Sequence, residues 1–443
     1  MRAWLFERFG VPIGSAYFRE DFGARLRRLE ESQWHDPAVV AEQQLERLRS
    51  LVAHARSRVP LYQDLYKDVH PEDLQRLEDV QKLPPVTKEM LREAYPGGVV
   101  AAGTPPGDAI PNSTSGSTGT PLAFFMSRVL LASKAARYFR GNRWAGARPG
   151  ERVYQIWGKQ EGGALRRGFI RHVAGRINRS AFTMDEATMA RYAAEIRRIG
   201  PRILEAYTTA AHALARHLRD AGEPRLPVGA VITSGETLSD TTRTLLAERV
   251  ASVFNRYGSR EFGAIAHECE LHAGLHVHAE SFLVEATDSR GRWRVGEPGR
   301  VLVTCFDNLS QPFIRYEIGD VAILEPEGCC PCGRGLPRLR EIQGRMVDLI
   351  VNPDGQVISV HYLTLLFEDY SAHVRRFQAI QTDANALEIL LVPTQRITPE
   401  VLGELQRKIE VHAGPRMRVT IRLTPDIPAG PDGKRRIMKR ELP

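Results

Sequence analysis

The chain has 443 residues, a length that suggests two or three domains, one of them large. An apolar fraction of 42% and a charged fraction of 26% are typical of a globular protein and exclude a fibrous or disordered chain. The formal net charge of +8 is small for this length and does not by itself indicate binding to nucleic acid.

The N-terminal segment MRAWLFERFGVPIGS is too polar and too short for a signal peptide. No apolar run approaches the ~20 residues of a membrane-spanning helix. We therefore expect a cytoplasmic protein with no membrane partner. The chain has only five cysteines, and a reducing compartment makes a metal site more plausible than a disulfide framework.

Helical patterns open the chain. Residues 36–57 carry apolar side chains at helical spacing, with Asp36 as the expected cap and Pro37 in the first turn. Residues 84–94 predict a second helix, with Thr87 as its N-cap. Residues 101–112 are rich in Gly and Pro and predict a loop.

From about residue 128 to 320, helical stretches alternate with short apolar runs. This alternation predicts an α/β domain with a largely parallel sheet. Residues 281–304 are more typical of paired strands, with a turn at 288–291. The expected helices are 186–198, 208–221 and 239–250, and the expected strands are 152–156, 229–233 and 300–304.

The pattern changes after Gly344. Residues 347–360 predict a strand, a turn and a second strand, followed by helices at 361–369 and 399–412 and strands near 387–392 and 417–423. This is a compact α+β unit. The expected fold class is therefore α/β, with sheets flanked by helices in a large domain over 1–346 and a small C-terminal α+β domain over 347–443.

The segment 113–122 is the most informative part of the chain. It holds six hydroxyl side chains and two glycines within ten residues. Glycines let the backbone approach a ligand, and successive N–H groups and hydroxyls can surround phosphate oxygens. No Gly-Lys-Ser/Thr follows, so this is not a Walker P-loop. The alternative is a flexible Ser/Gly linker. The phosphate-binding candidates are Thr114, Ser115, Gly116, Ser117, Thr118 and Gly119.

This loop resembles the phosphate loop of the adenylate-forming superfamily, and the chain resembles its phenylacetate–CoA ligase-like and CapK-like branch. Residues 83–88 and 58–62 are similar to that branch's upstream signatures. Further segments follow in the family's order, and together they cover nearly the whole chain. They are Ser234-Gly235-Glu236-Thr237-Leu238, Tyr257-Gly258-Ser259-Arg260-Glu261, Arg315-Tyr316-Glu317-Ile318-Gly319-Asp320, Gly344-Arg345 and Gly433-Lys434.

The resemblance implies ATP-dependent activation of a carboxylic acid as an acyl-adenylate, then transfer to a thiol, most simply coenzyme A. Catalysis of this kind is mainly positioning and charge stabilisation. Lys434 would lie between the carboxylate and the α-phosphate, and Glu261 would hold Mg²⁺. Asp320 would accept the ribose hydroxyls. The segments around Ser234, Gly235, Glu236, Thr237, Tyr257, Gly258 and Ser259 would line the adenine, and Arg345 would mark the inter-domain hinge.

Two positions depart from the family pattern. Arg260 replaces a Thr, so its guanidinium either contacts the α-phosphate or points away. Val347 replaces the charged residue expected two positions after Arg345, with Asp348 next, so the pivot of a mobile C-terminal domain shifts by one residue.

A late cysteine cluster predicts a zinc site. Cys269 and His276 precede Cys330-Pro331-Cys332-Gly333, which together offer three thiolates and an imidazole. Some relatives of the branch have such a cluster, where it is structural. The alternative ligands are Cys329, His272 and His278, and reduced, partly buried cysteines are the simpler alternative.

The acid pocket and the partners are the least determined features. Tyr154, Trp157 and Tyr207 are candidates to line an aromatic or small apolar slot, or are core residues. The acceptor is coenzyme A, a carrier-protein thiol or an amine. The basic stretches near 166–171 and 434–440 are solvated surface or attract ATP or coenzyme A. A zinc-bearing nucleic-acid-binding protein and a non-catalytic homologue remain the alternatives, and a homodimer is an expectation from the family alone.

Overall fold

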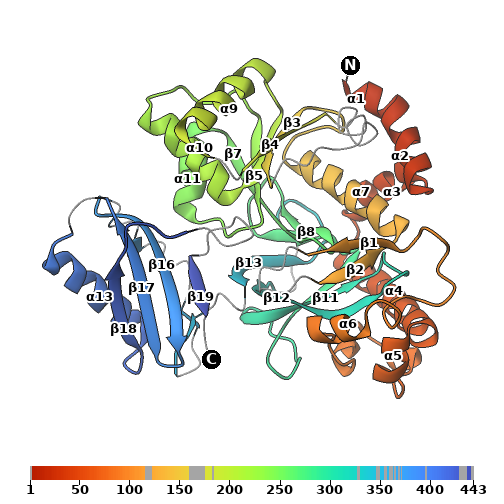
Figure 1. Cartoon of the computed structure of the whole chain (residues 1–443). Coiled ribbons are helices and arrows are strands. Elements are labelled where there is room, and N and C mark those ends of the chain that lie inside the picture. Colours follow the sequence, from red (N-terminus) through yellow and green to blue (C-terminus); the bar gives the residue numbers. More distant parts are fainter. Residues whose placement is uncertain are drawn as a thin grey trace. The chain divides into compact units, whose positions relative to one another are not determined.

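Figure 1 shows the computed structural model of the chain. Its described residues form two compact units, the first reaching to Ile342 and the second built from Gln343–Pro443 together with Gly319–Val321. In the described part of the chain, no helix is both long and apolar enough to span a bilayer. The described residues are 2–114, 122–158, 175–181, 184–326, 330–345, 350–353, 357–358, 363, 366–367, 370, 372–394, 397–428 and 437–440.

An eleven-stranded sheet dominates the first unit, in the order β10-β11-β12-β13-β9-β8-β7-β6-β5-β3-β4. Five neighbouring strands at one end are parallel, as the alternating pattern predicts. They are β3 (Val153–Trp157), β4 (Arg176–Ser180), β5 (Ile203–Tyr207), β6 (Ala230–Ser234) and β7 (Ser252–Ser259).

The rest of this sheet contains antiparallel pairs, including the predicted hairpin over 281–304. A separate two-stranded ribbon pairs β1 (Ile110–Ser113) with β2 (Ala123–Met126). The remaining strands of the large sheet are β8 (Gly263–Glu268), β9 (Leu275–Val277), β10 (Phe282–Thr287), β11 (Pro298–Cys305), β12 (Phe313–Leu324) and β13 (Arg338–Arg345).

Helices cover both faces of the parallel strands (Figure 1). α9 (Glu186–Ile199), α10 (Thr208–Asp220) and α11 (Asp240–Arg249) pack as a group on one face, and α7 (Arg128–Trp144) lies on the other. α9 begins where the Asp185 side chain accepts the Thr188 N–H and ends at the left-handed Gly200. The predicted helices 186–198, 208–221 and 239–250 are thus confirmed.

The chain up to Ala94 is mostly helical. Asp36 caps the predicted helix 36–57, and Thr87 caps a helix that begins at Lys88 rather than at 84. The helical segments before residue 36 were not predicted. They and those that follow are α1 (Arg2–Leu5), η1 (Phe6–Gly10), α2 (Val11–Phe18), α3 (Phe22–Ser32), α4 (Pro37–Arg58), α5 (Pro60–Leu65), η2 (Pro71–Asp73), η3 (Leu77–Lys82) and α6 (Lys88–Ala94).

The second unit has its own hydrophobic core and a four-stranded sheet in the order β18-β17-β16-β19. α13 (Pro399–Ala413) and strands β17 and β18 match the expected α+β pattern. Most of the predicted helix 361–369 lies outside the described residues. The strands are β14 (Ile350–Val351), β15 (Val357–Ile358), β16 (Val374–Asp383), β17 (Ala386–Pro393), β18 (Arg418–Leu423) and β19 (Met438–Arg440).

Candidate functional site

The parallel strands end at one edge of the sheet, and several predicted site residues stand there. β3 ends at Trp157, β5 at Tyr207, β6 at Ser234 and β7 at Ser259. Tyr207 is the cross-strand partner of Ser234, which in turn pairs with Arg256. Open α/β sheets bind ligands outside the carboxyl ends of their strands, so this edge is the expected place for a ligand.

The turn between β7 and β8 requires a glycine at position 258. A Cβ there would lie 2.2 Å from the carbonyl oxygen of Gly263, a distance no side chain tolerates. Tyr257 beside it is only 8% exposed and belongs to the main core. The Ser259 hydroxyl accepts the Phe262 N–H at 3.3 Å, which closes the turn locally.

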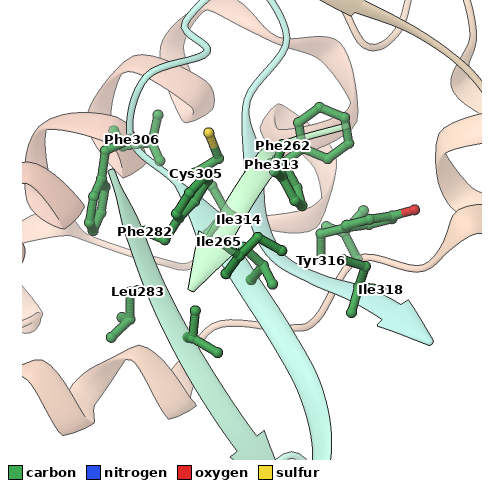
Figure 2. Close-up of a cluster of buried hydrophobic side chains, with 14 of the residues drawn as sticks. Phe262, Ile265, Phe282, Leu283, Cys305, Phe306, Phe313, Ile314, Tyr316 and Ile318 are labelled. Atoms are coloured by element: carbon green, nitrogen blue, oxygen red, sulfur yellow. The ribbon is translucent and has the colours of Figure 1, made fainter. Parts of the chain in front are cut away.

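This turn presents Arg260 and Glu261. Glu261 is buried, and the Tyr316 hydroxyl donates to its Oε1 at 3.0 Å. The next residue, Phe262, anchors the turn because its ring packs edge-on against Phe313 and Tyr316, with centroids 5.2 and 6.0 Å away (Figure 2). Arg260 Nε donates to Asn112 Oδ1 at 3.4 Å, so the exposed guanidinium reaches β1 rather than pointing away from it.

The predicted phosphate loop has a closed stem. The Thr114 N–H donates to the Leu122 carbonyl at 2.9 Å, and the Leu122 N–H donates to Thr114 Oγ1 at 2.9 Å. The stem continues the β1–β2 ribbon, whose Asn112 contacts Arg260. Ser115, Gly116, Ser117, Thr118 and Gly119 lie outside the described residues.

The residues at the end of β6 and after it have two structural roles, turning the chain and capping a helix. Ser234 is buried at the strand end, and Gly235 turns the chain with φ 82°. The Glu236 carboxylate accepts the Thr209 N–H at 2.8 Å and the Thr209 hydroxyl at 3.1 Å. It therefore caps the first turn of α10, where no residue of the helix supplies a side-chain cap. Thr237 is exposed.

Of the three candidate pocket residues, the structure brings two together. The rings of Trp157 and Tyr207 stack with centroids 4.1 Å apart at the ends of β3 and β5. Tyr154, three positions before Trp157, faces the other side of the sheet. It is fully buried, and its hydroxyl donates to Glu195 Oε2 at 2.7 Å. Tyr154 is therefore a core residue, and the prediction that it lines the pocket is corrected.

Three further predicted residues belong to the end of the chain or to the second unit. Asp320 lies in β12 within Gly319–Val321, which groups with the second unit. Arg345 is the last residue of β13. Lys434, like Val347 and Asp348, lies outside the described residues.

The four predicted metal ligands come together in the first unit. The ligand atoms of Cys269, His276, Cys330 and Cys332 all lie within 4.8 Å of one another. Cys269 Sγ and Cys330 Sγ are 3.9 Å apart, and Cys332 Sγ is 3.4 Å from His276 Nε2. For a tetrahedral ion with metal–sulfur bonds of about 2.3 Å, sulfur–sulfur edges of roughly 3.8 Å and sulfur–nitrogen edges of roughly 3.5 Å are expected, and these two separations match them.

The surroundings select His276 among the candidate histidines. Its Nδ1 lies 3.4 Å from the Leu336 carbonyl, which leaves Nε2 for Cys332. Burial lowers the pKa of His276 to about 4, so the imidazole is neutral, as a metal ligand must be. His272 instead contacts Glu268, and His278 contacts Arg140. Cys329 lies outside the described residues.

Sequence reasoning missed the residues that hold the β7–β8 turn from other elements. In the sequence, Tyr316 stands out only as part of a motif, and no motif includes Lys134 or Arg137 of α7. Their contacts with the turn span more than fifty residues of sequence. The only signal in the sequence is two cations three positions apart on a helix, which is normally read as a solvated surface.

Comparisons with known proteins bear on both units. Residues 350–441 match the family model of the CapK C-terminal domain. The chain is 27% identical over 431 residues to phenylacetate-coenzyme A ligase of Thermus thermophilus, covering 89% of this chain and 94% of that protein. It is 22% identical over 370 residues to protein CapK of Staphylococcus aureus, covering 81% and 79%. A solved structure of 2-hydroxyisobutyryl-CoA ligase in its postadenylation state, with R3-HIB-AMP, has the same fold, with a TM-score of 0.73, 20% identity and coverage of 93% and 91%.

Proposed function

The chain belongs to the adenylate-forming superfamily, on the branch of phenylacetate–CoA ligases and CapK, and from this premise we propose that it is an AMP-forming acid–CoA ligase. It would join a carboxylic acid to the α-phosphate of ATP, release pyrophosphate, and then transfer the acyl group to the thiol of coenzyme A with release of AMP. The observation that carries the proposal is the convergence of Ser234, the β7–β8 turn and the closed loop stem in one unit, next to the carboxyl ends of parallel strands.

The first half-reaction brings two anions together. A carboxylate oxygen attacks the α-phosphorus, the bond to the bridging oxygen breaks, and pyrophosphate carries away the electron pair. Glu261 offers a buried carboxylate for Mg²⁺, a hard ion that would neutralise phosphate charge. Arg260 reaches Asn112 beside the loop stem, which favours contact with the α-phosphate over the alternative that it points away.

The remaining roles follow the family motifs. Residues 115–119 would wrap the phosphates, Asp320 would bind the ribose hydroxyls, and Ser234 and Gly235 would line the adenine. Lys434, carried by a C-terminal domain that we place at 347–443, would supply positive charge to the reacting oxygens. The stacked pair Trp157–Tyr207 favours a flat or small apolar acid at the strand ends.

We also propose that Cys269, His276, Cys330 and Cys332 bind one structural Zn²⁺. The donor separations fit a tetrahedral ion, and four protein ligands leave no open position for catalysis. Bound zinc would link three segments: the one after β8, strand β9, and the one that precedes β13. It would thereby stabilise the first unit.

Acid-dependent exchange of pyrophosphate into ATP tests this function. A panel of aryl, hydroxy and short aliphatic acids is offered to the purified protein, and the acceptor is then identified by mass spectrometry with coenzyme A, a carrier protein and amines. We expect exchange with a subset of the acids, and a loss of about 100- to 1000-fold in the Lys434→Ala variant. An intact protein that catalyses no exchange with any acid would instead favour a non-catalytic homologue.

A further inference from the structure

Helix α7 holds the β7–β8 turn through two cations that lie one helical turn apart. Lys134 Nζ donates to the carbonyl oxygens of Arg260 at 2.9 Å and of Glu261 at 3.3 Å. Arg137 donates from Nη2 to Phe262 at 2.8 Å and from Nε to Ala264 at 3.1 Å, in both cases to the carbonyl. Side chains at i and i+3 share a helix face, so one face of α7 accounts for the three carbonyl groups of the turn and for that of Ala264 in β8.

The two cations differ in their surroundings. Arg137 is fully buried, with its guanidinium 3.2 Å from the Asp307 carboxylate and 2.7 Å from the Ser281 hydroxyl. Lys134 is half-buried, and within the described ranges it forms no salt bridge. Arg137 therefore has a structural counter-charge, whereas the Lys134 ammonium is directed at the part of the turn that carries the two site side chains.

Local packing fixes where the Lys134 ammonium lies. Gly263 has φ 71°, and a Cβ there would come within 3.0 Å of Lys134 Cε, so the lysine stem crosses the turn where a side chain is missing. Burial, with repulsion from Arg137, lowers the pKa of Lys134 to about 8.

We propose that Lys134 is a positioning residue for the adenylation half-reaction. It holds the Arg260 and Glu261 carbonyls in place. It thereby sets the position from which the Arg260 side chain reaches β1 and the Glu261 side chain reaches Tyr316. Without it, Arg137 and the Phe262 ring still hold the far side of the turn, but the residues that would meet the phosphates and Mg²⁺ lose their support. This inference rests on the proposed function, because it assigns a role within that reaction.

The test compares Lys134→Met, which keeps the stem and removes the ammonium, with Lys134→Arg, which restores the charge and the donors. Lys82→Met is the matched control, since Lys82 also donates to a carbonyl, that of Asp73, but lies in η3. Three quantities are measured: pyrophosphate exchange as a function of Mg²⁺, thioester formation from a supplied acyl-adenylate and coenzyme A, and amide hydrogen exchange of the peptide covering 256–265.

For Lys134→Met we expect kcat of pyrophosphate exchange to fall about 10- to 100-fold, as for a displacement of a site group by ~1 Å. The Mg²⁺ concentration for half-maximal rate should rise, thioester formation should stay within about twofold, and amides 259–262 should exchange faster. Lys134→Arg should recover most of the rate, and Lys82→Met should match the parent protein.

Two results would overturn the inference. One is parent-like exchange kinetics and parent-like amide protection in Lys134→Met. The other is an equal fall of both half-reactions that Lys134→Arg does not rescue, which would indicate a general structural role. If the parent protein itself catalyses no exchange, the proposed function fails, and amide protection of the turn still decides whether Lys134 holds it.

Discussion

The carboxyl edge of the parallel strands and the Cys/His cluster lie in the same unit, but their polar side chains have different kinds of partners. At the edge, each candidate side chain is supported from a different element, Glu261 by Tyr316 and Arg260 by Asn112. In the cluster, four donors face one another within 4.8 Å. A site that admits substrate keeps donors and acceptors directed outward, whereas a structural site uses all of its donors on one partner.

This difference predicts that substitutions at the edge change rates and that substitutions in the cluster change stability. Arg137 shows that one side chain can combine both kinds of support. It donates to the Phe262 carbonyl in the turn, and Asp307 neutralises its own charge. Burial alone would raise the pKa of Asp307, but Arg47, Arg137 and Arg25 outweigh that effect and lower it.

The largest expected effect is on the chemistry of the edge. Glu261→Gln keeps the size of the side chain and an oxygen for the Tyr316 hydroxyl, but removes the charge that would hold Mg²⁺. We expect pyrophosphate exchange to fall about 100- to 1000-fold, with a denaturant midpoint within error of the parent. Glu89→Gln, in the exposed pair with Arg92, is the control. A normal rate in Glu261→Gln would remove this carboxylate from the proposed site.

The predicted parallel sheet implies an edge of carboxyl ends, but the sequence does not show what supports the residues there. Ser234 follows an apolar run that reads as a buried strand, and the carboxyl ends of parallel strands must lie along one edge. The contacts of Lys134 and Tyr316 with the turn depend on how helices and distant strands pack, which local periodicity does not encode. Motif order located the residues, and tertiary packing decided their partners.

For Tyr154, strand geometry alone decides between the two alternatives, pocket wall and core residue. Tyr154 and Trp157 lie three positions apart in one strand, so alternation already places them on opposite faces and excludes a shared pocket wall. The sequence already names His276 as the ligand, with His272 and His278 as alternatives. The pairing of β9 with both β8 and β13 brings His276 to the three cysteines and favours it over the other two histidines.

A smaller effect, on stability, is expected in the cluster. Cys330→Ser removes one donor from a buried set, so we expect loss of bound zinc and a destabilisation of roughly 3 kcal/mol, or about 6–12 °C in Tm. Zinc content by atomic spectroscopy and thermal unfolding measure both. Cys305→Ser, a buried cysteine outside the cluster, should retain the metal. The exchange rate per folded molecule should remain within about threefold, and a far larger fall would show that the cluster serves the chemistry directly.

The smallest expected effect concerns Glu236, which lies at the edge but makes the hydrogen bonds of a structural residue. Glu236 accepts two hydrogen bonds from Thr209 at the start of α10, so Glu236→Ala should cost about 1 kcal/mol in urea unfolding. Glu236→Gln should cost less, because an oxygen acceptor remains while the favourable charge at the helix N-terminus is lost. The KM for ATP should change by less than about threefold in either variant, since the carboxylate is already engaged by the helix. The opposite result would be a rise of more than about tenfold in the KM for ATP of Glu236→Ala with an unchanged urea midpoint. Glu236 would then belong to the binding site with Glu261. In that case position at the strand ends would predict function better than the hydrogen bonds of the side chain do.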